Sequence, residues 1–134
     1  MANGLEKIGR EFRAVLPDEG SLAQAVHAAA PAARVVSAFQ HVPAAAFAAL
    51  DDEMETDVVV CADDEDARVQ VLDLVAAMPG LRAFDGGSLA NSLGVEAFAA
   101  VLLTINLRYR GEGTLRMLGV EGHPGSGEPG ARGR

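Results

Sequence analysis

The chain has 134 residues, of which 49% are hydrophobic and 22% charged, and its formal net charge is -8. This size and composition fit one globular domain and exclude a collagen-like or long disordered chain. A single cysteine, Cys61, excludes an intramolecular disulfide framework and fits a reducing, cytoplasmic compartment. The negative charge disfavours nucleic acid as a partner. The apolar runs are shorter than the roughly 20 residues of a membrane span, so no membrane partner is expected.

The first regular pattern begins at Ser21, and residues 1–20 are interpreted as a connecting segment. Ser21 can cap an alanine-rich helix over Leu22–Ala30, because its hydroxyl accepts from N–H groups of the first turn. Arg34–Phe39 is a short β-branched run typical of a strand buried on both faces. Pro43 then suits the first position of a second helix.

A second strand-to-helix unit follows. Thr56–Cys61 predicts a strand, and the acids at 63–66 lie at the positive end of the next helix. The inner stripe of that helix is predicted to hold Ala67, Val71, Leu74, Val75 and Met78. Leu81–Phe84 predicts a third strand, and the turn Asp85–Ser88 leads into a long helix that ends at Tyr109. Its inner stripe is predicted to hold Gly94, Phe98, Val101, Leu102, Ile105 and Tyr109.

Alternating strands and helices indicate an α/β fold with a partial Rossmann-like parallel sheet of about three strands flanked by helices, formed by residues 21–119. Residues 120–134 are rich in glycine and proline and predict a disordered tail. Three strands are few for such a sheet, and an exposed apolar edge invites pairing. We therefore expect the chain to be part of a larger sheet or to form a homo-oligomer.

In an open parallel sheet, ligands bind beyond the carboxyl ends of the strands. The loops Gln40–Pro43, Ala62–Glu65 and Asp85–Asn91 are therefore expected to lie side by side. His41 could hydrogen-bond a ligand there, or it could be a histidine at a helix entrance with no ligand role. No GxGxxG follows a predicted strand and no GxxxxGK is present, so the sequence shows no motif for binding a cofactor phosphate.

Other reactive residue types have structural interpretations. The acidic clusters at 51–53 and 63–66 lack the spacing of a calcium loop and are interpreted as helix caps and solvated charge, with no metal site. Cys61 has no adjacent cation and is expected to be a buried core residue.

Several motifs occur together in a fixed order. They are RVVSAF at 34–39, HVPA at 41–44, DVVVCADD at 57–64, DxGxLxNSxxVE at 85–96 and LRML at 115–118. In motif order and spacing, the chain from about Ala2 to Gly119 resembles the C-terminal half of NADPH-dependent F420 reductases, also called F420-dependent NADP oxidoreductases.

The resemblance implies an oxidoreductase that transfers a hydride between NADPH and the deazaflavin coenzyme F420, with this half supplying the F420 side of the pocket. The cofactor-binding residues it implies are Gln40, His41, Val42 and Pro43 against the reacting rings, and Asn91 and Ala97 in the segment that closes the pocket. It implies no catalytic side chain, because ring-to-ring hydride transfer depends mainly on positioning.

The chain departs from the family pattern at three positions. Gln40, Leu93 and Ala97 stand where the family has His, commonly Arg, and Ser. The resemblance also implies that the N-terminal dinucleotide-binding half, with the NADP site, lies outside this sequence. A start set downstream of the true one, a split or decayed gene, and a fragment that works with another chain are all left open.

Two other classes compete with the reductase fragment. One is a non-catalytic remnant that serves as an interaction or dimerisation module, which the three departures favour. The other is a flavodoxin-like or response-regulator-like domain, which explains the alternating pattern but not the ordered motifs.

Overall fold

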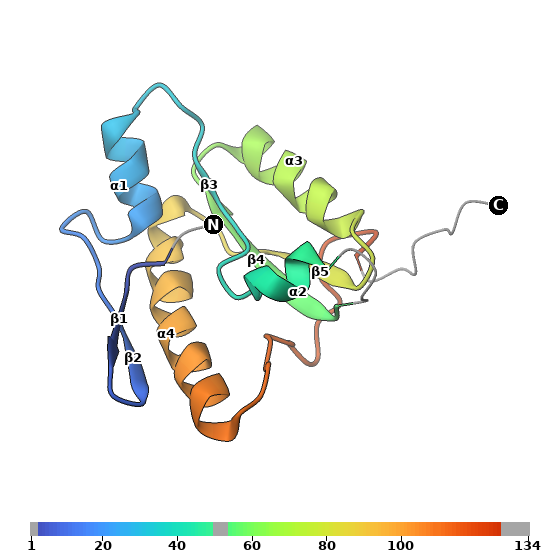
Figure 1. Ribbon diagram of the computed structural model, residues 1–134. Helices are drawn as coiled ribbons and strands as arrows, with labels where there is room; N and C mark the ends of the chain where they lie inside the picture. The colour runs from blue at the N-terminus through green and yellow to red at the C-terminus, as the bar shows by residue number, and fades with distance from the viewer. Residues whose placement is uncertain (1–2, 50–53, 127–134) are drawn as a thin grey trace.

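The computed structural model describes residues 3–49 and 54–126 (Figure 1). The chain forms five strands and four α-helices within these residues. The elements are β1 (Leu5–Ile8), β2 (Glu11–Ala14), α1 (Leu22–Ala29), β3 (Val36–Ser37), α2 (Ala44–Ala48), β4 (Thr56–Ala62), α3 (Glu65–Ala76), β5 (Leu81–Asp85), a 3-10 turn (Leu89–Asn91) and α4 (Ser92–Tyr109). The fold is α/β, as predicted, and every predicted helix and strand has a counterpart.

The main sheet has the order β3-β4-β5 and is mixed, which corrects the prediction of a parallel sheet. β4 and β5 are parallel, and their register pairs Val58 with Ala83. β3 runs antiparallel to β4, with Val36 opposite Ala62 and Ser37 opposite Cys61. β3 therefore begins beside the carboxyl end of β4, and the residues that follow it run toward the amino end.

β3 is shorter than the predicted strand because its backbone turns at Phe39. Phe39 has a φ of 67°, in the left-handed region that a bulky residue rarely adopts. The Val42 N–H donates to the Phe39 carbonyl over 3.2 Å and closes the turn. The chain thus leaves the sheet before a longer ladder can form.

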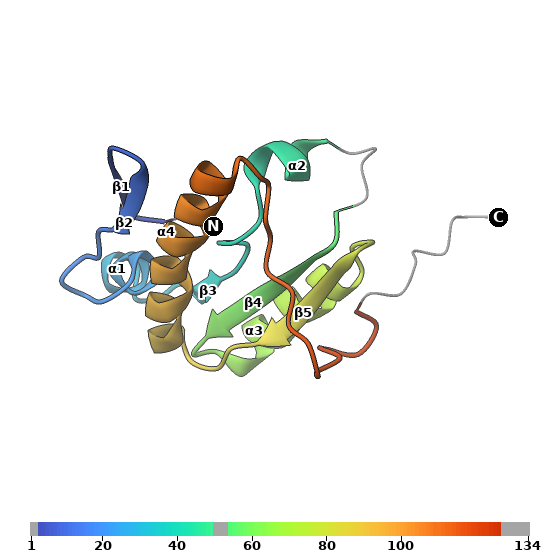
Figure 2. The ribbon, with the colours of Figure 1, turned by 90° about the horizontal axis from the view of Figure 1, so that it is seen from below.

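The hydrophobic core lies between the sheet and α3, which covers one face of β4 and β5 (Figure 2). Val58, Val60 and Ala83 from the strands meet Leu72 and Val75 from α3. The α3 stripe is confirmed at its centre. It differs at one edge, because Leu72 is buried whereas Leu74 is 56% exposed.

The segment after α4 packs along the sheet and closes the edge at β5. The Asp57 N–H donates to the Leu115 carbonyl over 2.8 Å, and the His123 N–H donates to the Ala83 carbonyl over 2.7 Å. The Ser126 hydroxyl accepts from the Ala83 N–H. Residues 120–126 of the predicted tail thus lie against β5 through one backbone bond and the side-chain bonds of Ser126 and Arg82. Residues 127–134 lie outside the described residues.

A β-hairpin occupies part of the predicted connecting segment. β1 and β2 are antiparallel, and a two-residue turn with Gly9 at a φ of 61° joins them. The hairpin packs on α4, where the Thr104 hydroxyl accepts from the Phe12 N–H over 2.9 Å. Two short runs of mixed apolar and charged residues on either side of Gly9 are the sequence signal for this hairpin, which lies within the segment 1–20 interpreted as a connection.

The long helix α4 does not bury the stripe that the sequence predicts. The side chains of Phe98, Val101, Ile105 and Tyr109 are 40%, 50%, 43% and 82% exposed. The buried residues are Ser92, Glu96, Ala99 and Ala100. Ser92 and Glu96 bond to Ser21 and to the first turn of α1, so this small and polar face packs against α1 while the large apolar residues remain partly exposed.

By length and composition alone, the helical stretch Leu89–Tyr109 could cross a membrane, with a mean hydropathy of 1.4 over its most apolar window. Such evidence is weak, because core helices of soluble proteins pass the same test. α4 also binds through polar side chains to α1 and to the hairpin, which fits a helix packed within a folded domain.

Two glycine substitutions should have opposite effects on stability. Gly80 has a φ of 78°, and an added Cβ would lie 2.3 Å from the Met54 carbonyl oxygen, so Gly80→Ala should lower the free energy of unfolding by about 2 kcal/mol or more. In Gly94→Ala, the added Cβ meets nothing within 4 Å on helix α4, so stability should rise by up to about 1 kcal/mol. Urea denaturation of both variants measures the contrast, and equal effects would contradict these backbone assignments.

Candidate functional site

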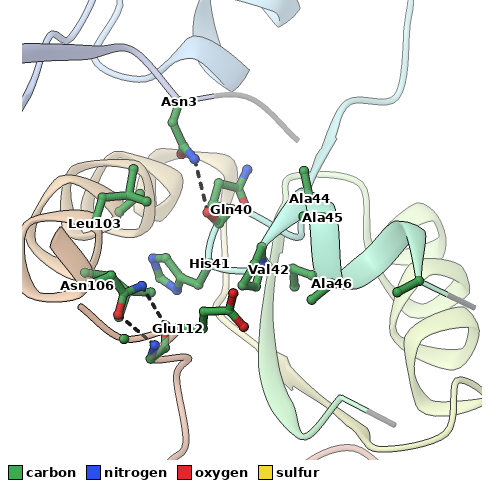
Figure 3. A pocket seen from close by; sticks show the side chains of 16 residues that line it. Asn3, Gln40, His41, Val42, Ala44, Ala45, Ala46, Leu103, Asn106 and Glu112 are labelled. Atoms are coloured by element: carbon green, nitrogen blue, oxygen red, sulfur yellow. Dashed lines mark hydrogen bonds between the residues drawn. The ribbon is translucent and has the colours of Figure 1, made fainter. Parts of the chain in front are cut away.

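A cavity of about 600 Å³ lies between the β3–α2 connection and α4 (Figure 3). This volume is within the range of small-molecule sites. The wall is mostly small and apolar, with polar groups from three segments of the chain. The lining residues are Asn3, Gln40, His41, Val42, Pro43, Ala44, Ala45, Ala46, Ala49, Ala99, Leu102, Leu103, Asn106, Gly111, Glu112 and Gly113.

The left-handed turn at Phe39 positions the polar side chains of this cavity. It reverses the chain just before Gln40 and His41, and Pro43 is then the N-cap residue of α2. Phe39 itself packs against Phe47 of α2, with ring centroids 5.5 Å apart. Backbone strain of this kind persists only where the surrounding structure holds it.

Gln40 is only 7% exposed, and its side-chain amide is half satisfied. Its Nε2 donates to the Ser37 hydroxyl over 2.7 Å, whereas its Oε1 is buried and has no hydrogen-bond partner among the described residues. Asn3 donates from Nδ2 to the Gln40 backbone carbonyl over 3.1 Å, and its Oδ1 is likewise buried without a partner. Buried polar atoms are nearly always paired in folded proteins, so these two acceptors are exceptions.

His41 is 8% exposed and lies between the cavity and α4. Its Nε2 is 2.7 Å from the Val95 carbonyl oxygen. A carbonyl can only accept, so Nε2 carries the proton and, in the neutral ring, Nδ1 is an acceptor. The ring also meets the edge of Phe98 at 5.4 Å. Burial lowers the pKa of His41 below 6.5, and the bond to Val95 offsets part of that effect.

The lowered pKa of His41 makes stability depend on pH. The folded protein disfavours the charged ring. The stability that the neutral His41 contributes is therefore fully present above the ordinary pKa of 6.5, and it is lost as the pH falls from there through the pKa of the folded state. His41→Asn should therefore lose less stability than the wild type when the pH falls from 8 to 5. Urea denaturation at both pH values measures the difference, and identical losses would contradict a neutral, buried His41.

The wall opposite Gln40 comes from the second half of α4 and the loop after it. Asn106 donates from Nδ2 to the Gly113 carbonyl over 3.0 Å and accepts from the Gly113 N–H over 2.7 Å. These two bonds fold the loop back against α4, so that Gly111 and Glu112 reach the cavity. Ala99 and Leu103 complete an apolar surface on this side.

The predicted site residues are not all brought together. Gln40, His41, Val42 and Pro43 line the cavity, whereas Asn91 and Ala97 do not. Asn91 donates from Nδ2 to the Gly86 carbonyl over 2.8 Å at the carboxyl end of β5. Ala97 is a half-buried residue in the first half of α4.

Of the three loops expected to lie side by side, two lie together and the third lies elsewhere. Asp63 accepts from the Leu89 N–H over 2.9 Å, so the loops after β4 and β5 do meet. The segment Gln40–Pro43 packs on α4 through the His41 bond to Val95 instead. The expectation is wrong for this segment because β3 is antiparallel and carries it away from the carboxyl edge of the sheet.

The DxGxLxNSxxVE motif organises the start of α4 through hydrogen bonds within the chain. The Ser21 and Ser92 hydroxyls are 2.7 Å apart and fully buried. Both Glu96 carboxylate oxygens accept from the first turn of α1, over 2.7 Å from the Leu22 N–H and 3.1 Å from the Ala23 N–H. The motif therefore fixes α4 against α1 and the β5 loop.

Twelve of the sixteen lining residues were not predicted as site residues, among them Asn3, Leu103, Asn106 and Glu112. Asn3 lies far from the other lining residues in sequence, and no spacing rule connects it to them. The pair Asn106 and Gly113 offered a signal, because an Asn in the last turn of a helix followed by glycines is typical of a closed loop.

Other predicted features have structural roles. Cys61 is fully buried, as expected, and burial followed by the charge of Asp85 raises its thiol pKa. Asp64 caps α3 by accepting from the Ala67 N–H over 2.8 Å, as the capping interpretation requires. The cluster at 51–53 lies outside the described residues. Among the residues that the structure describes, no group of three or more His, Cys, Asp or Glu side chains could hold a metal ion.

Known proteins similar to this chain include three curated archaeal relatives, and no family model matches it. The F420-dependent NADP reductase of Methanocaldococcus jannaschii is 37% identical over 110 residues, which are 81% of this chain and 49% of that protein. The F420-dependent NADP reductases of Methanothermobacter thermautotrophicus and Methanothermobacter marburgensis are 30% and 29% identical over 58% of this chain.

The chain spans about half the length of the first of these relatives and about a third of the other two. Identity of this extent, in three proteins of the same name, agrees with the resemblance drawn from the motifs. The chain is a homologue of the F420-dependent NADP reductases that corresponds to part of their length.

Proposed function

We propose that this chain forms the deazaflavin side of a site that transfers a hydride between NADP(H) and coenzyme F420, with the nicotinamide side supplied by residues outside this sequence. The observation that carries the proposal is the cavity at Gln40–Pro43, in a chain 37% identical to an F420-dependent NADP reductase. The chemistry that a deazaflavin supplies when bound is hydride exchange at a ring carbon.

The cavity has the apolar walls that a flat aromatic ring requires. Its walls carry alanines from α2 and Ala99 and Leu103 from α4, which offer a smooth apolar surface. These residues would hold the ring, orient it and exclude water, and such positioning can account for most of the rate of a hydride transfer.

His41 would contribute a fixed, uncharged wall. The bond to the Val95 carbonyl selects the Nε2 proton, and the lowered pKa keeps the ring neutral near pH 7. Gln40 cannot titrate and His41 is held neutral, so neither residue would donate a proton at neutral pH. Asn91 and Ala97 remain proposed residues of a closing segment that would act together with the nicotinamide side.

Two assays with the full 134-residue chain test this proposal. Titration with an 8-hydroxy-5-deazaflavin, followed by its fluorescence, should show saturable binding. A mixture with NADPH should show no oxidation, followed as NADPH absorbance, until a chain with a nucleotide-binding half is added. Failure to bind the deazaflavin, or rapid turnover by the chain alone, would refute the proposed half-site.

The second candidate is an interaction or dimerisation module without redox activity. This candidate is favoured by four exposed apolar residues on α4, namely Phe98, Val101, Ile105 and Tyr109. A contiguous exposed apolar surface is typical of a protein–protein contact, because water contact with it is unfavourable in a monomer. Sedimentation of the chain separates the candidates when it is combined with the fluorescence titration. Self-association without deazaflavin binding would favour the module.

A further inference from the structure

Helix α4 carries an apolar ridge outside the cavity. Its members are four positions apart in sequence, and such residues form one ridge along a helix surface. The ridge consists of Leu93, Ala97, Val101, Ile105 and Tyr109. None of these residues lines the cavity or belongs to the buried face of α4, and the four large side chains are exposed, from 40% at Leu93 to 82% at Tyr109. An apolar surface of this kind is typical of a contact with another protein.

A groove of about 330 Å³ borders the C-terminal half of the ridge. It lies between α4 and β2 and is lined by Glu11, Phe12, Val101, Thr104, Ile105, Arg108 and Tyr109. Two helices pack when the ridge of one enters a groove beside the ridge of the other. α4 carries both parts of such a contact, because the N-terminal half of its ridge offers the exposed Leu93 and the C-terminal half borders the groove.

The two ends of the ridge lie beside opposite charges. The hairpin turn lies near the C-terminal end of α4, where Arg108 Nε donates to the Arg10 carbonyl over 3.4 Å (Figure 1). The cations at this end outnumber Glu11 and Glu112, and they are Lys7, Arg10, Arg108 and Arg110.

The other end of the ridge is acidic. A Cβ added at Gly20 would lie 3.7 Å from Leu93 Cδ1, so the loop before α1 adjoins the start of the ridge. The two residues before Gly20 are Asp18 and Glu19, and both are exposed. A partner that matches this surface must therefore be apolar along its centre, basic at the Leu93 end and acidic at the Tyr109 end.

A second copy of the chain, turned end to end, meets these requirements. Val101 is eight positions from Leu93 and eight from Tyr109. A two-fold axis at Val101 would place Leu93 of each copy beside Tyr109 and the groove of the other, about 12 Å from the axis along the helix. The acidic end of each copy would then face the basic end of the other, whereas parallel helices would bring like charges together.

We propose that the α4 ridge is a two-fold interface between antiparallel α4 helices of two copies of this chain, with Leu93 of each copy seated in the groove beside Tyr109 of the other. The interface is independent of the proposed hydride site, because no ridge residue lines the cavity. It therefore gives the exposed surface of α4 the same partner under either candidate function.

Cross-linking of single-cysteine additions to the full chain tests the arrangement. The variants are Val101→Cys, Leu93→Cys and Tyr109→Cys, with Leu74→Cys on α3 as the matched control, since Leu74 is also apolar and is 56% exposed. The fully buried Cys61 is the only native cysteine. Each variant, and each pair of variants mixed, is treated with a short bismaleimide and analysed by denaturing electrophoresis.

We expect Val101→Cys to cross-link to itself, because it lies at the axis. Leu93→Cys and Tyr109→Cys should each stay largely uncross-linked alone and should form a cross-linked dimer when mixed. Leu74→Cys should cross-link neither to itself nor to the other variants.

Sedimentation velocity over a concentration series measures the association itself. Val101→Glu should raise the dimer dissociation constant at least about tenfold, because it brings two carboxylates together at the centre of the interface. Leu74→Glu should associate like the wild type, and circular dichroism of both variants verifies that they are folded.

Three results would overturn the proposed interface. They are a wild-type chain that stays monomeric at the highest concentration, equal association of Val101→Glu and the wild type, and self-cross-linking of Leu93→Cys and of Tyr109→Cys without a mixed product, which indicates parallel helices. The deazaflavin titration tests the proposed function separately. A wild-type chain that dimerises as expected but does not bind the deazaflavin would refute the hydride half-site and support the interface.

Discussion

Replacing Asp57 by Ala is expected to lower the free energy of unfolding by about 3–5 kcal/mol. The Asp57 side chain is fully buried in β4, and it binds Arg82 in β5 through two bonds of 2.8 and 2.7 Å. The bonds to Asp57 raise the pKa of Arg82 further, so the guanidinium stays charged at every accessible pH. Without Asp57, a cation that is 12% exposed would lose its partner.

The loss should extend beyond the two strands, because this ion pair also anchors the segment after α4. Asp57 accepts from the Met117 N–H over 2.5 Å, and Arg82 donates to the Met117 and Val120 carbonyls. Local hydrogen exchange in residues 115–126 should therefore increase in the Asp57→Ala variant.

Arg13→Ala is the matched control for the buried pair. Arg13 and Glu11 also form an ion pair, at 3.1 Å, but their side chains are 58% and 42% exposed. Such a pair is worth at most about 1 kcal/mol. Urea denaturation measures both variants, and similar losses for Asp57→Ala and Arg13→Ala would contradict the role assigned to the buried pair.

Glu96→Ala is expected to cost about 2–4 kcal/mol of stability, since it leaves the buried first turn of α1 without its acceptors. The Glu96 side chain is 1% exposed and accepts from the N–H groups of Leu22 and Ala23. A carboxylate at a helix N-terminus also interacts favourably with the helix dipole. The variant should therefore loosen α1 from α4.

Circular dichroism during thermal unfolding measures this effect. Glu19→Ala is the control, because Glu19 is exposed just before the same helix. A Glu96→Ala variant as stable as Glu19→Ala would show that the VE pair of the motif does not join the two helices.

The secondary structure was predictable where local chemistry determines it. Ser21 does accept from the Gln24 N–H over 3.0 Å at the start of α1, and the β-branched run at 56–61 does form the central strand. In each case the element is determined by interactions among residues close in sequence, so the prediction does not depend on tertiary packing.

The direction of β3 could not be predicted, and the error moved the candidate site. A short apolar run occurs in both parallel and antiparallel strand pairs, so it does not predict strand direction. The feature that ends β3 and redirects the chain is the left-handed backbone at Phe39. No rule based on residue type predicts a positive φ at a phenylalanine. The loop Gln40–Pro43 was identified, but its neighbours in space were not.

The α4 surface shows a second limit. A hydrophobic periodicity predicts which residues could be buried, whereas contacts with a hairpin some 90 positions earlier decide which ones are. Ala99 and Ala100 face the interior because small side chains allow close approach, and Phe98 and Val101 remain outside. For the same reason Asn3 could not be predicted as a cavity residue, because its position depends on the path of the whole N-terminal segment.

The most direct test of the proposed site is an amide chemical-shift titration of the isotopically labelled full chain with an 8-hydroxy-5-deazaflavin. The site proposed at Gln40–Pro43 predicts that the largest shifts fall in residues 40–46, 99–106 and 111–113, which enclose the cavity. Shifts concentrated instead at residues 62–65 and 85–91, where the loops after β4 and β5 meet, would contradict it.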